Sequence, residues 1–368
     1  MNGGKRSVHR AITAGVLAYG RDLLIFFAVL VVLPALASPK WSLNDKISTL
    51  PAMRVSFINP AEPGEAFWDR VTDLMQQEAQ ARNIELKVYY AQRNRLQVLA
   101  LAKQIVQQVP KPDYLIFVFQ AHLGEHLLSL TEAARVNSFS INTNIPAQEM
   151  SEIGEPRQKY RYWLGHMFPD EQSAGFTLAQ SLVAQAREQT DSEAKLPLRM
   201  IAIAGGHDSA ASIERMDGLR VFLKAQPKVI LAQEVKASWQ KDKAHDMAAV
   251  LLQRYPETSI IWAASDLMAL GALEAAEKQG KIPGKTLFTG GFDGTREGLK
   301  ALSQGRMQAT MSGHYIEGAR ALALLHAHFN GQDFADTQGT RIRTKLTLIY
   351  PGNVSSYLSG PEPQASNP

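Results

Sequence analysis

The feature that most constrains this chain is a repeated alternation of short apolar segments with longer segments of helical periodicity. Segments of the first series are RVSFIN (54–59), ELKVYY (85–90), YLIFVF (114–119) and SFSIN (138–142). Those of the second series are RMIAIAG (199–205), VILAQEV (229–235), SIIWAA (259–264) and TLFTGG (286–291). Strands that are apolar throughout are typical of parallel sheets covered by helices on both faces. The sequence therefore predicts an α/β protein with two similar doubly wound parallel-sheet lobes.

Helical periodicity fills the spaces between these strands, for example at 209–225, 241–254 and 266–279. The segment 146–170 is polar and contains prolines, so we interpret it as the connection between the two lobes. The tail 353–368 has no periodicity and is predicted to be disordered.

The N-terminus has the pattern of a secretory signal peptide. Four basic residues precede an apolar run at 23–33, and Ala35-Leu36-Ala37 follows before a serine. This predicts a signal peptide over 1–37, and the alternative is an uncleaved membrane anchor. In both cases the rest of the chain is expected on the periplasmic side of the inner membrane.

Charge and cysteine content exclude several classes of function. The formal charge of +4 falls by 3, to +1, when 1–37 with its four basic residues and Asp22 is removed. A nearly neutral protein gives no electrostatic case for nucleic-acid binding. The chain has no cysteine, which excludes disulfides, thiolate nucleophiles and cysteine zinc sites. We expect neither a metal nor a cofactor.

Ligands of open α/β sheets bind outside the carboxyl ends of the strands. The residues at those ends are mainly aromatic, amide or hydroxyl side chains, with few groups suited to breaking bonds. One such end, TLFTGGFDGT (286–295), has glycines that could cradle phosphate, but Asp293 would repel it. The sequence therefore predicts binding of a polar ligand without catalysis.

Two short motifs could indicate an enzyme instead. HLGEH (122–126) matches an inverted zinc-protease pattern, but no third ligand is marked in the sequence. GGHDS (205–209) contains His, Asp and Ser but lacks the strained nucleophile elbow, so we interpret it as a turn capped by Asp208 or Ser209.

Four stretches together resemble the type I periplasmic solute-binding proteins, the ribose- and galactose-binding group related to the lactose-repressor ligand domain. They are SAASIERMDGLRVFL (209–223), SIIWAASDLMALGALEAAEKQGK (259–281), FTGGFDGT (288–295) and RMQATMSG (306–313). The resemblance covers roughly 54–350. It implies two lobes that are joined by a hinge of three crossovers and close on a ligand. The N-terminal lobe is expected at 53–168 plus 314–335, and the C-terminal lobe at 169–313 plus 336–352.

The resemblance implies that Arg215 donates two parallel hydrogen bonds to the ligand and that Asp293 accepts two hydroxyl hydrogens. The alternative to ligand binding by Arg215 is an ion pair with Glu214 or Asp217 on the helix surface. Aromatic side chains would cover the C–H faces of a sugar. The full set of expected ligand-binding residues is Phe67, Trp68, Asn142, Arg215, Trp239, Ser265, Asp293 and His314.

For some of these residues a structural role competes with ligand binding. Trp68 lies off the apolar stripe of its helix and is preferred over Phe67, which could belong to the core. Asp266 is expected to cap the helix at 266–279, which leaves Ser265 for the ligand. The chain also departs from the family, with Ser265-Asp266 where an Asn-Asp pair is common and Asn142-Thr143 where sugar binders often carry Asp-Arg.

The sequence thus predicts an exported, monomeric protein that binds a sugar or sugar-like molecule and is not an enzyme. An inner-membrane ABC importer is the expected partner. The alternative is a sensory protein that signals to a membrane receptor or histidine kinase.

Overall fold

The computed structural model describes residues 52–120, 122–189 and 197–359. The predicted signal peptide and the last nine residues of the tail lie outside this part of the chain. Within the described ranges, no helix is both long enough and apolar enough to cross a membrane.

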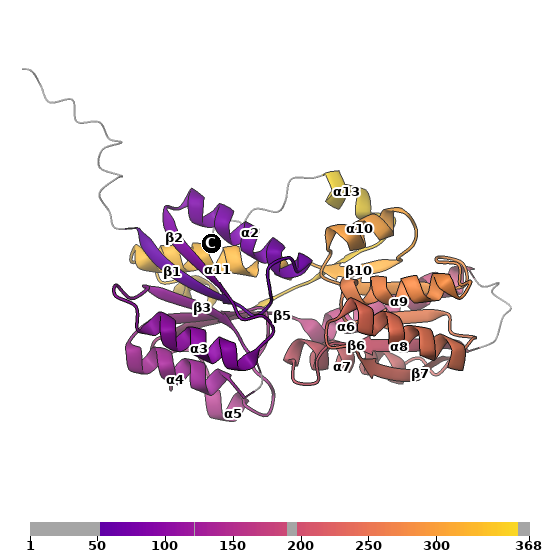
Figure 1. Cartoon of the computed structure of the whole chain (residues 1–368), viewed down its shortest axis with the longest axis horizontal. Coiled ribbons are helices and arrows are strands. Elements are labelled where there is room, and N and C mark those ends of the chain that lie inside the picture. Colours follow the sequence, from indigo (N-terminus) through magenta and orange to yellow (C-terminus); the bar gives the residue numbers. More distant parts are fainter. Residues whose placement is uncertain (1–51, 121, 190–196, 360–368) are drawn as a thin grey trace, which may run out of the picture. The chain divides into compact units, whose positions relative to one another are not determined.

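The N-terminal lobe is built on a six-stranded parallel sheet with the strand order β11-β5-β4-β3-β1-β2 (Figure 1). Its strands are β1 (Met53–Asn59), β2 (Ile84–Tyr90), β3 (Tyr114–Val118), β4 (Asn137–Ile141), β5 (Trp163–Pro169) and β11 (Arg341–Thr344). Its helices are α2 (Ala66–Ala81), α3 (Arg95–Val106), α4 (Gly124–Ala134), α5 (Met150–Ile153), η1 (His314–Ile316), α11 (Glu317–Phe329) and α12 (Ala335–Gln338).

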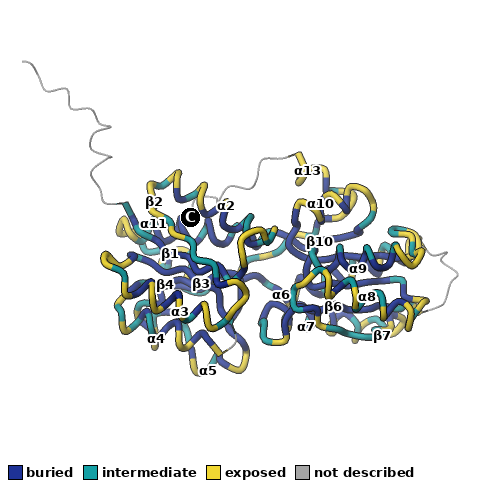
Figure 2. Tube along the Cα trace, in the orientation of Figure 1, coloured by how far each residue is buried: buried dark blue, intermediate teal, exposed yellow. Residues whose placement is uncertain are grey.

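Helices cover both faces of this sheet, as the apolar strands require. Along β3, Tyr114 and Ile116 pack into the core under α2 and α11, whereas Leu115 and Phe117 pack into the core under α3 and α4. Successive side chains of a strand point to opposite faces, so a strand between two helical layers must be apolar at every position. Figure 2 shows the central strands buried and the outer surfaces of the helices exposed.

The C-terminal lobe has a sheet of the same size with the strand order β12-β10-β9-β8-β6-β7. All its strands pair in parallel except β12, which is antiparallel to β10. The strands are β6 (Leu198–Ala204), β7 (Val229–Lys236), β8 (Ile260–Ala263), β9 (Phe288–Phe292), β10 (Ala309–Ser312) and β12 (Thr347–Ile349). The helices are α6 (Glu171–Gln189), α7 (Ala210–Lys224), α8 (Lys241–Arg254), α9 (Asp266–Lys278), α10 (Arg296–Ser303) and α13 (Val354–Ser359).

The chain passes between the two sheets three times: after β5, after β10 and between β11 and β12. This confirms the predicted fold class of two doubly wound lobes joined by three crossovers. The position of the third crossover differs from the expectation. Residues 341–344, assigned to the C-terminal lobe, form β11 and pair with β5 in the N-terminal sheet.

Two other segments differ from the sequence interpretation. The expected connection at 146–170 contains β5, a fully buried strand of the N-terminal sheet. The tail, predicted to be disordered from 353, continues as helix α13, and Val354 packs into the core of the C-terminal lobe.

Candidate functional site

A cleft of about 490 Å³ is lined by residues of both lobes, at the carboxyl ends of their strands. All eight residues expected to bind ligand line this cleft: Phe67, Trp68, Asn142, Arg215, Trp239, Ser265, Asp293 and His314. The strand-end rule and the cleft therefore agree on the edge of each sheet. The contacts of individual side chains nevertheless differ from what the sequence predicts.

Arg215 on α7 is buried, and its guanidinium is largely occupied by protein groups. Its Nε and Nη2 donate two parallel hydrogen bonds to the carboxylate of Glu171, each 2.7 Å long. Its Nη1 donates to the backbone oxygen of Ala264 at 2.7 Å, and the ring of Phe292 lies 4.3 Å from the guanidinium carbon. The Nε–Nη2 edge of Arg215 is therefore occupied by Glu171, and a contact of Arg215 with the ligand stays a prediction.

The surface ion pair considered for Arg215 is also absent. Glu214 accepts a hydrogen bond from Asn144 across the lobes, and Asp217 pairs with Arg220. Glu171, the actual partner, was missed. It is the first residue of α6, two residues after the end of β5, so recognition of β5 as a strand would have placed it at a strand end.

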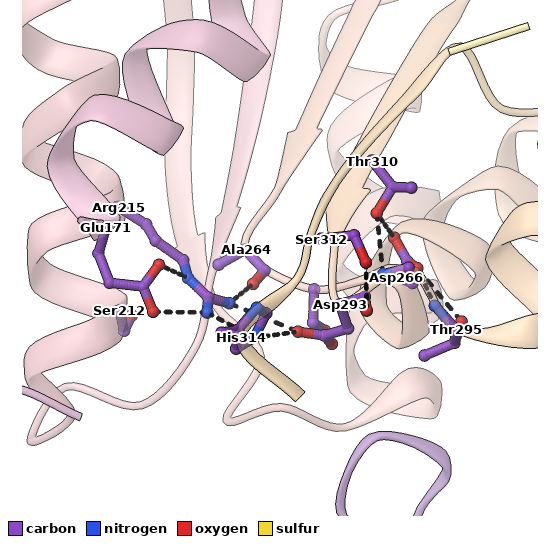
Figure 3. Close-up of polar contacts among 12 residues, drawn as sticks. Glu171, Ser212, Arg215, Ala264, Asp266, Asp293, Thr295, Thr310, Ser312 and His314 are labelled. Carbon is purple, nitrogen blue, oxygen red and sulfur yellow. Dashed lines mark hydrogen bonds and ion pairs between the residues drawn. The ribbon is translucent and has the colours of Figure 1, made fainter. Parts of the chain in front are cut away.

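Asp293 occupies a strained turn after β9. Its φ of 103° is a conformation that few residues other than glycine adopt. Its backbone N–H donates to Met311, and its backbone oxygen accepts a hydrogen bond from Ser312. These bonds hold the turn so that the carboxylate lies at the cleft, 3.8 Å from Nη1 of Arg215 and 3.4 Å from Nε2 of His314 (Figure 3).

His314 follows the second crossover and is buried. Its ring stacks on Phe67 of α2 in the same lobe, with the centroids 4.6 Å apart. Its Nε2 lies 3.4 Å from Nη2 of Arg215. Its Nδ1 is buried and has no hydrogen-bond partner among the described residues.

The capping role predicted for Asp266 belongs to Ser265. Ser265 is the N-cap of α9, and its hydroxyl accepts a hydrogen bond from the backbone of Met268. Asp266 is completely buried behind Asp293 and accepts hydrogen bonds from the hydroxyls of Thr310 and Thr295 (Figure 3). Burial, and then the charge of Asp293, raise the pKa of Asp266. Asp266 is thus a structural support of the turn that carries Asp293.

The aromatic residues of the cleft also differ from the expected ranking. Trp68 is 8% exposed and packs into the core of the N-terminal lobe beside Phe57, whereas Phe67 is half-buried and stacks on His314. The preference for Trp68 over Phe67 is therefore not supported by their packing. Trp239 follows β7 in a left-handed conformation, with its indole against Gly205.

Asn142 ends β4 in a left-handed conformation, with a φ of 68°. Its backbone N–H donates to Oε2 of Glu317 at 2.9 Å, and its side-chain Nδ2 is buried without a partner among the described residues. Burial raises the pKa of Glu317 to about 8. Glu317 begins α11 and also accepts a hydrogen bond from Thr344 in β11. No sequence pattern singles out Glu317.

The two enzyme-like motifs have structural roles. His122 precedes α4 and is exposed, so it does not share a helix face with His126. Among the described residues, no group of three His, Cys, Asp or Glu side chains could hold a metal ion. In GGHDS, Ser209 caps α7 as predicted, through a hydrogen bond from the backbone of Ser212.

Comparisons with known proteins find similarity to periplasmic sugar-binding proteins. Residues 164–333 match the model of a periplasmic binding protein domain. The D-allose-binding periplasmic protein of Escherichia coli is 35% identical over 127 residues, which is 34% of this chain and 40% of that protein. The ribose import binding protein of Salmonella typhimurium is 32% identical over 114 residues, which is 31% of this chain and 37% of that protein. The matches thus span less than half the length of these curated relatives.

The structural likeness covers more of the chain. A crystal structure of a periplasmic sugar-binding protein from Pseudomonas fluorescens superposes with a TM-score of 0.76 at 29% identity, covering 83% of this chain and 89% of that one. The matched domain and this superposition agree with the resemblance carried by the four sequence motifs.

Proposed function

We propose that this chain, which has the fold of the type I periplasmic sugar-binding proteins, is an exported binding protein that holds a sugar or sugar-like molecule between its lobes. The observation that supports this most is the convergence of Asp293, Trp239 and Phe67 on one cleft at the carboxyl ends of both sheets. A carboxylate can accept hydroxyl hydrogens, and aromatic faces can cover the C–H groups of a sugar ring.

The hinge supports a clamping mechanism. Arg70 on α2 donates a hydrogen bond to the backbone oxygen of Gly294 in the other lobe at 2.8 Å, and Arg95 lies 3.4 Å from Asp208 across the cleft. Contacts of this kind form and break as two lobes move about a hinge. Ligand would shift the chain to the closed form by binding it better than the open form.

We further propose that the closed form delivers its ligand to an ABC importer of the inner membrane. The related ribose protein is named for import, which favours this partner over the sensory receptor that the sequence left open. Periplasmic location and a monomeric state belong to the same proposal. In this role the chain binds its ligand and carries out no reaction on it.

A ligand screen followed by calorimetry tests the binding proposal. Sugars and polyols are screened for an increase in melting temperature, and hits are titrated into wild type and into Asp293→Asn. Asparagine tolerates positive φ, so the turn is kept while the charge is lost. We expect at least about tenfold weaker binding, since a charged hydrogen bond exceeds a neutral one by about 1.4 kcal/mol.

The matched control is Asp217→Asn, which removes the same charge from an exposed position on α7. It is expected to bind like wild type. Equal affinity of Asp293→Asn and wild type would remove Asp293 from the site. X-ray scattering that shows no compaction in the presence of a bound sugar would contradict the hinge mechanism.

A further inference from the structure

A side chain outside the cleft connects the two lobes at the turn that carries Asp293. Building on the proposed function, we infer that Arg70 is a positioning residue for ligand binding. It is not one of the residues that line the cleft. From α2 in the N-terminal lobe it holds the turn that presents Asp293 in the C-terminal lobe, and it thereby stabilises the closed form of the chain.

The contact of Arg70 joins the lobes directly. Its Nη1 donates a hydrogen bond of 2.8 Å to the backbone oxygen of Gly294. Gly294 comes directly after Asp293 in the turn that follows β9. A guanidinium that donates to a carbonyl oxygen forms a charge-assisted hydrogen bond, which is stronger than a bond between two neutral groups. Separation of the lobes would break this bond.

The turn that receives the bond is fixed within its own lobe. Asp293 and Gly294 both have positive φ, at 103° and 62°. The backbone N–H of Gly294 donates to the hydroxyl of Thr310, and that of Thr295 donates to the carboxylate of Asp266. Because these bonds tie the turn to its lobe, a contact that fixes Gly294 against α2 also fixes the carboxylate of Asp293 one residue earlier.

Arg70 is oriented for this contact by its own lobe. Its guanidinium carbon lies 3.5 Å from the centre of the ring of Tyr315, and Tyr315 is buried in the core of the N-terminal lobe. An aromatic face attracts a cation electrostatically, so this ring can hold the guanidinium in place when the lobes are apart. Closure then costs little additional side-chain entropy at Arg70.

Two pairs of consecutive residues therefore meet where the lobes come together. His314 lines the cleft, and its Nε2 lies 3.4 Å from Oδ1 of Asp293 (Figure 3). The next residue on each side continues the contact, because Tyr315 supports Arg70 and Arg70 binds Gly294. Arg70 thus acts on the carboxylate of Asp293 through the backbone, without touching the ligand.

Ligand titration of Arg70 variants tests the inference. The aldoses D-ribose, D-allose, D-galactose and D-glucose are titrated into the full mature chain by calorimetry, and stopped-flow mixing separates association from dissociation. For any of these sugars that binds wild type, Arg70→Met is expected to bind about tenfold more weakly. The loss should lie in the dissociation rate, because the closed form opens more easily. Arg70→Lys keeps a cation beside Tyr315 and should recover part of the affinity.

The matched control is Arg161→Met, which removes an exposed arginine of the same lobe and should bind like wild type. Closure is measured separately, as the distance between spin labels at Gln104→Cys on α3 and Gln253→Cys on α8. Both positions are exposed, and the chain has no cysteine of its own. At saturating sugar, wild type should give the short distance of the closed form, whereas Arg70→Met should retain a population at the longer distance.

The outcomes separate this inference from the proposed function. Arg70→Met that binds and closes like wild type overturns the inference and leaves the proposed function in place. A weaker affinity with the dissociation rate and label distance of wild type also overturns it, because Arg70 would then support only the fold of its lobe. If none of the four sugars binds wild type, the proposed function fails and this inference fails with it.

Discussion

At the scale of single residues, Arg215 shows how burial changes what a charged side chain does. The sequence pattern predicts that its removal would affect ligand binding and leave the melting temperature near that of wild type. In the structure, both oxygens of the buried Glu171 carboxylate accept hydrogen bonds from Arg215, and among the described contacts no other residue binds them. Its contribution to folding therefore has to be considered before its contribution to binding.

We expect Arg215→Met to lower the free energy of unfolding by about 3–5 kcal/mol, because Glu171 is left buried without its counter-charge. Urea denaturation measures the loss. Arg220→Met on the same helix is the control, since Arg220 makes its ion pairs at the surface and should cost no more than about 1 kcal/mol. A double variant with Glu171→Met should recover part of the loss. Equal stability of Arg215→Met and wild type would contradict the buried ion pair.

Neighbouring glycines allow the position of Trp239 to be tested. A Cβ on Gly205 would come 2.3 Å from the indole, so Gly205→Ala should displace Trp239 and weaken sugar binding by about tenfold. Gly206→Ala is the control, because its nearest neighbour at 3.1 Å is the flexible side chain of Asp208. Ligand titrations followed by tryptophan fluorescence measure the affinities of both variants. Similar affinities of the two variants would show that Trp239 does not contact the ligand.

At the scale of elements, the alternation of strands and helices made most of the fold predictable. Segments such as 241–254 were expected as helices and form them, because a helix on a sheet must carry an apolar stripe. β5 was missed because Gly165 and His166 interrupt its apolar run. Gly165 is required there, since a Cβ would lie 2.5 Å from the ring of Phe139. Missing β5 hid both the end of the strand and Glu171 beyond it.

Close packing of α6 on α7 supports the Arg215–Glu171 pair. A Cβ on Gly175 would come 2.0 Å from the backbone oxygen of Arg215. We expect Gly175→Ala to destabilise the protein by roughly 1–3 kcal/mol, although alanine favours helix, because the two helices would have to separate. Gln180→Ala, on the exposed face of α6, should change stability by less than about 0.5 kcal/mol. Thermal unfolding measures the stability of both variants. A Gly175→Ala variant that is more stable than wild type would contradict this packing.

At the scale of the whole molecule, a buried polar contact links each crossover to the cleft. Glu171 follows the first crossover and holds Arg215. His314 follows the second and lies beside Asp293. At the third, Thr344 donates to Glu317, which in turn accepts from the backbone of Asn142. In the proposed closure, these polar contacts would couple movement of the hinge to rearrangement of the cleft. The sequence could not show this, because the partners are far apart along the chain.

Glu317 gives the stability of the fold a measurable dependence on pH. Burial raises its pKa from 4.5 to about 8, so between these values the folded chain holds a proton that the unfolded chain releases. Stability from this group is therefore complete below pH 4.5 and is lost as the pH rises to about 8. Because a change of one in pKa corresponds to about 1.4 kcal/mol, the loss amounts to a few kcal/mol.

Glu317→Gln mimics the protonated acid, so we expect its free energy of unfolding to decline less steeply over this range and to exceed that of wild type near pH 8. Urea denaturation at a series of pH values measures both slopes. Glu188→Gln replaces an exposed carboxylate at the end of α6 and should retain the slope of wild type. Parallel slopes for wild type and Glu317→Gln would show that Glu317 does not hold a proton at the hinge. A reduced slope would identify the buried carboxylic acid of Glu317 as a contributor to the stability of the N-terminal lobe.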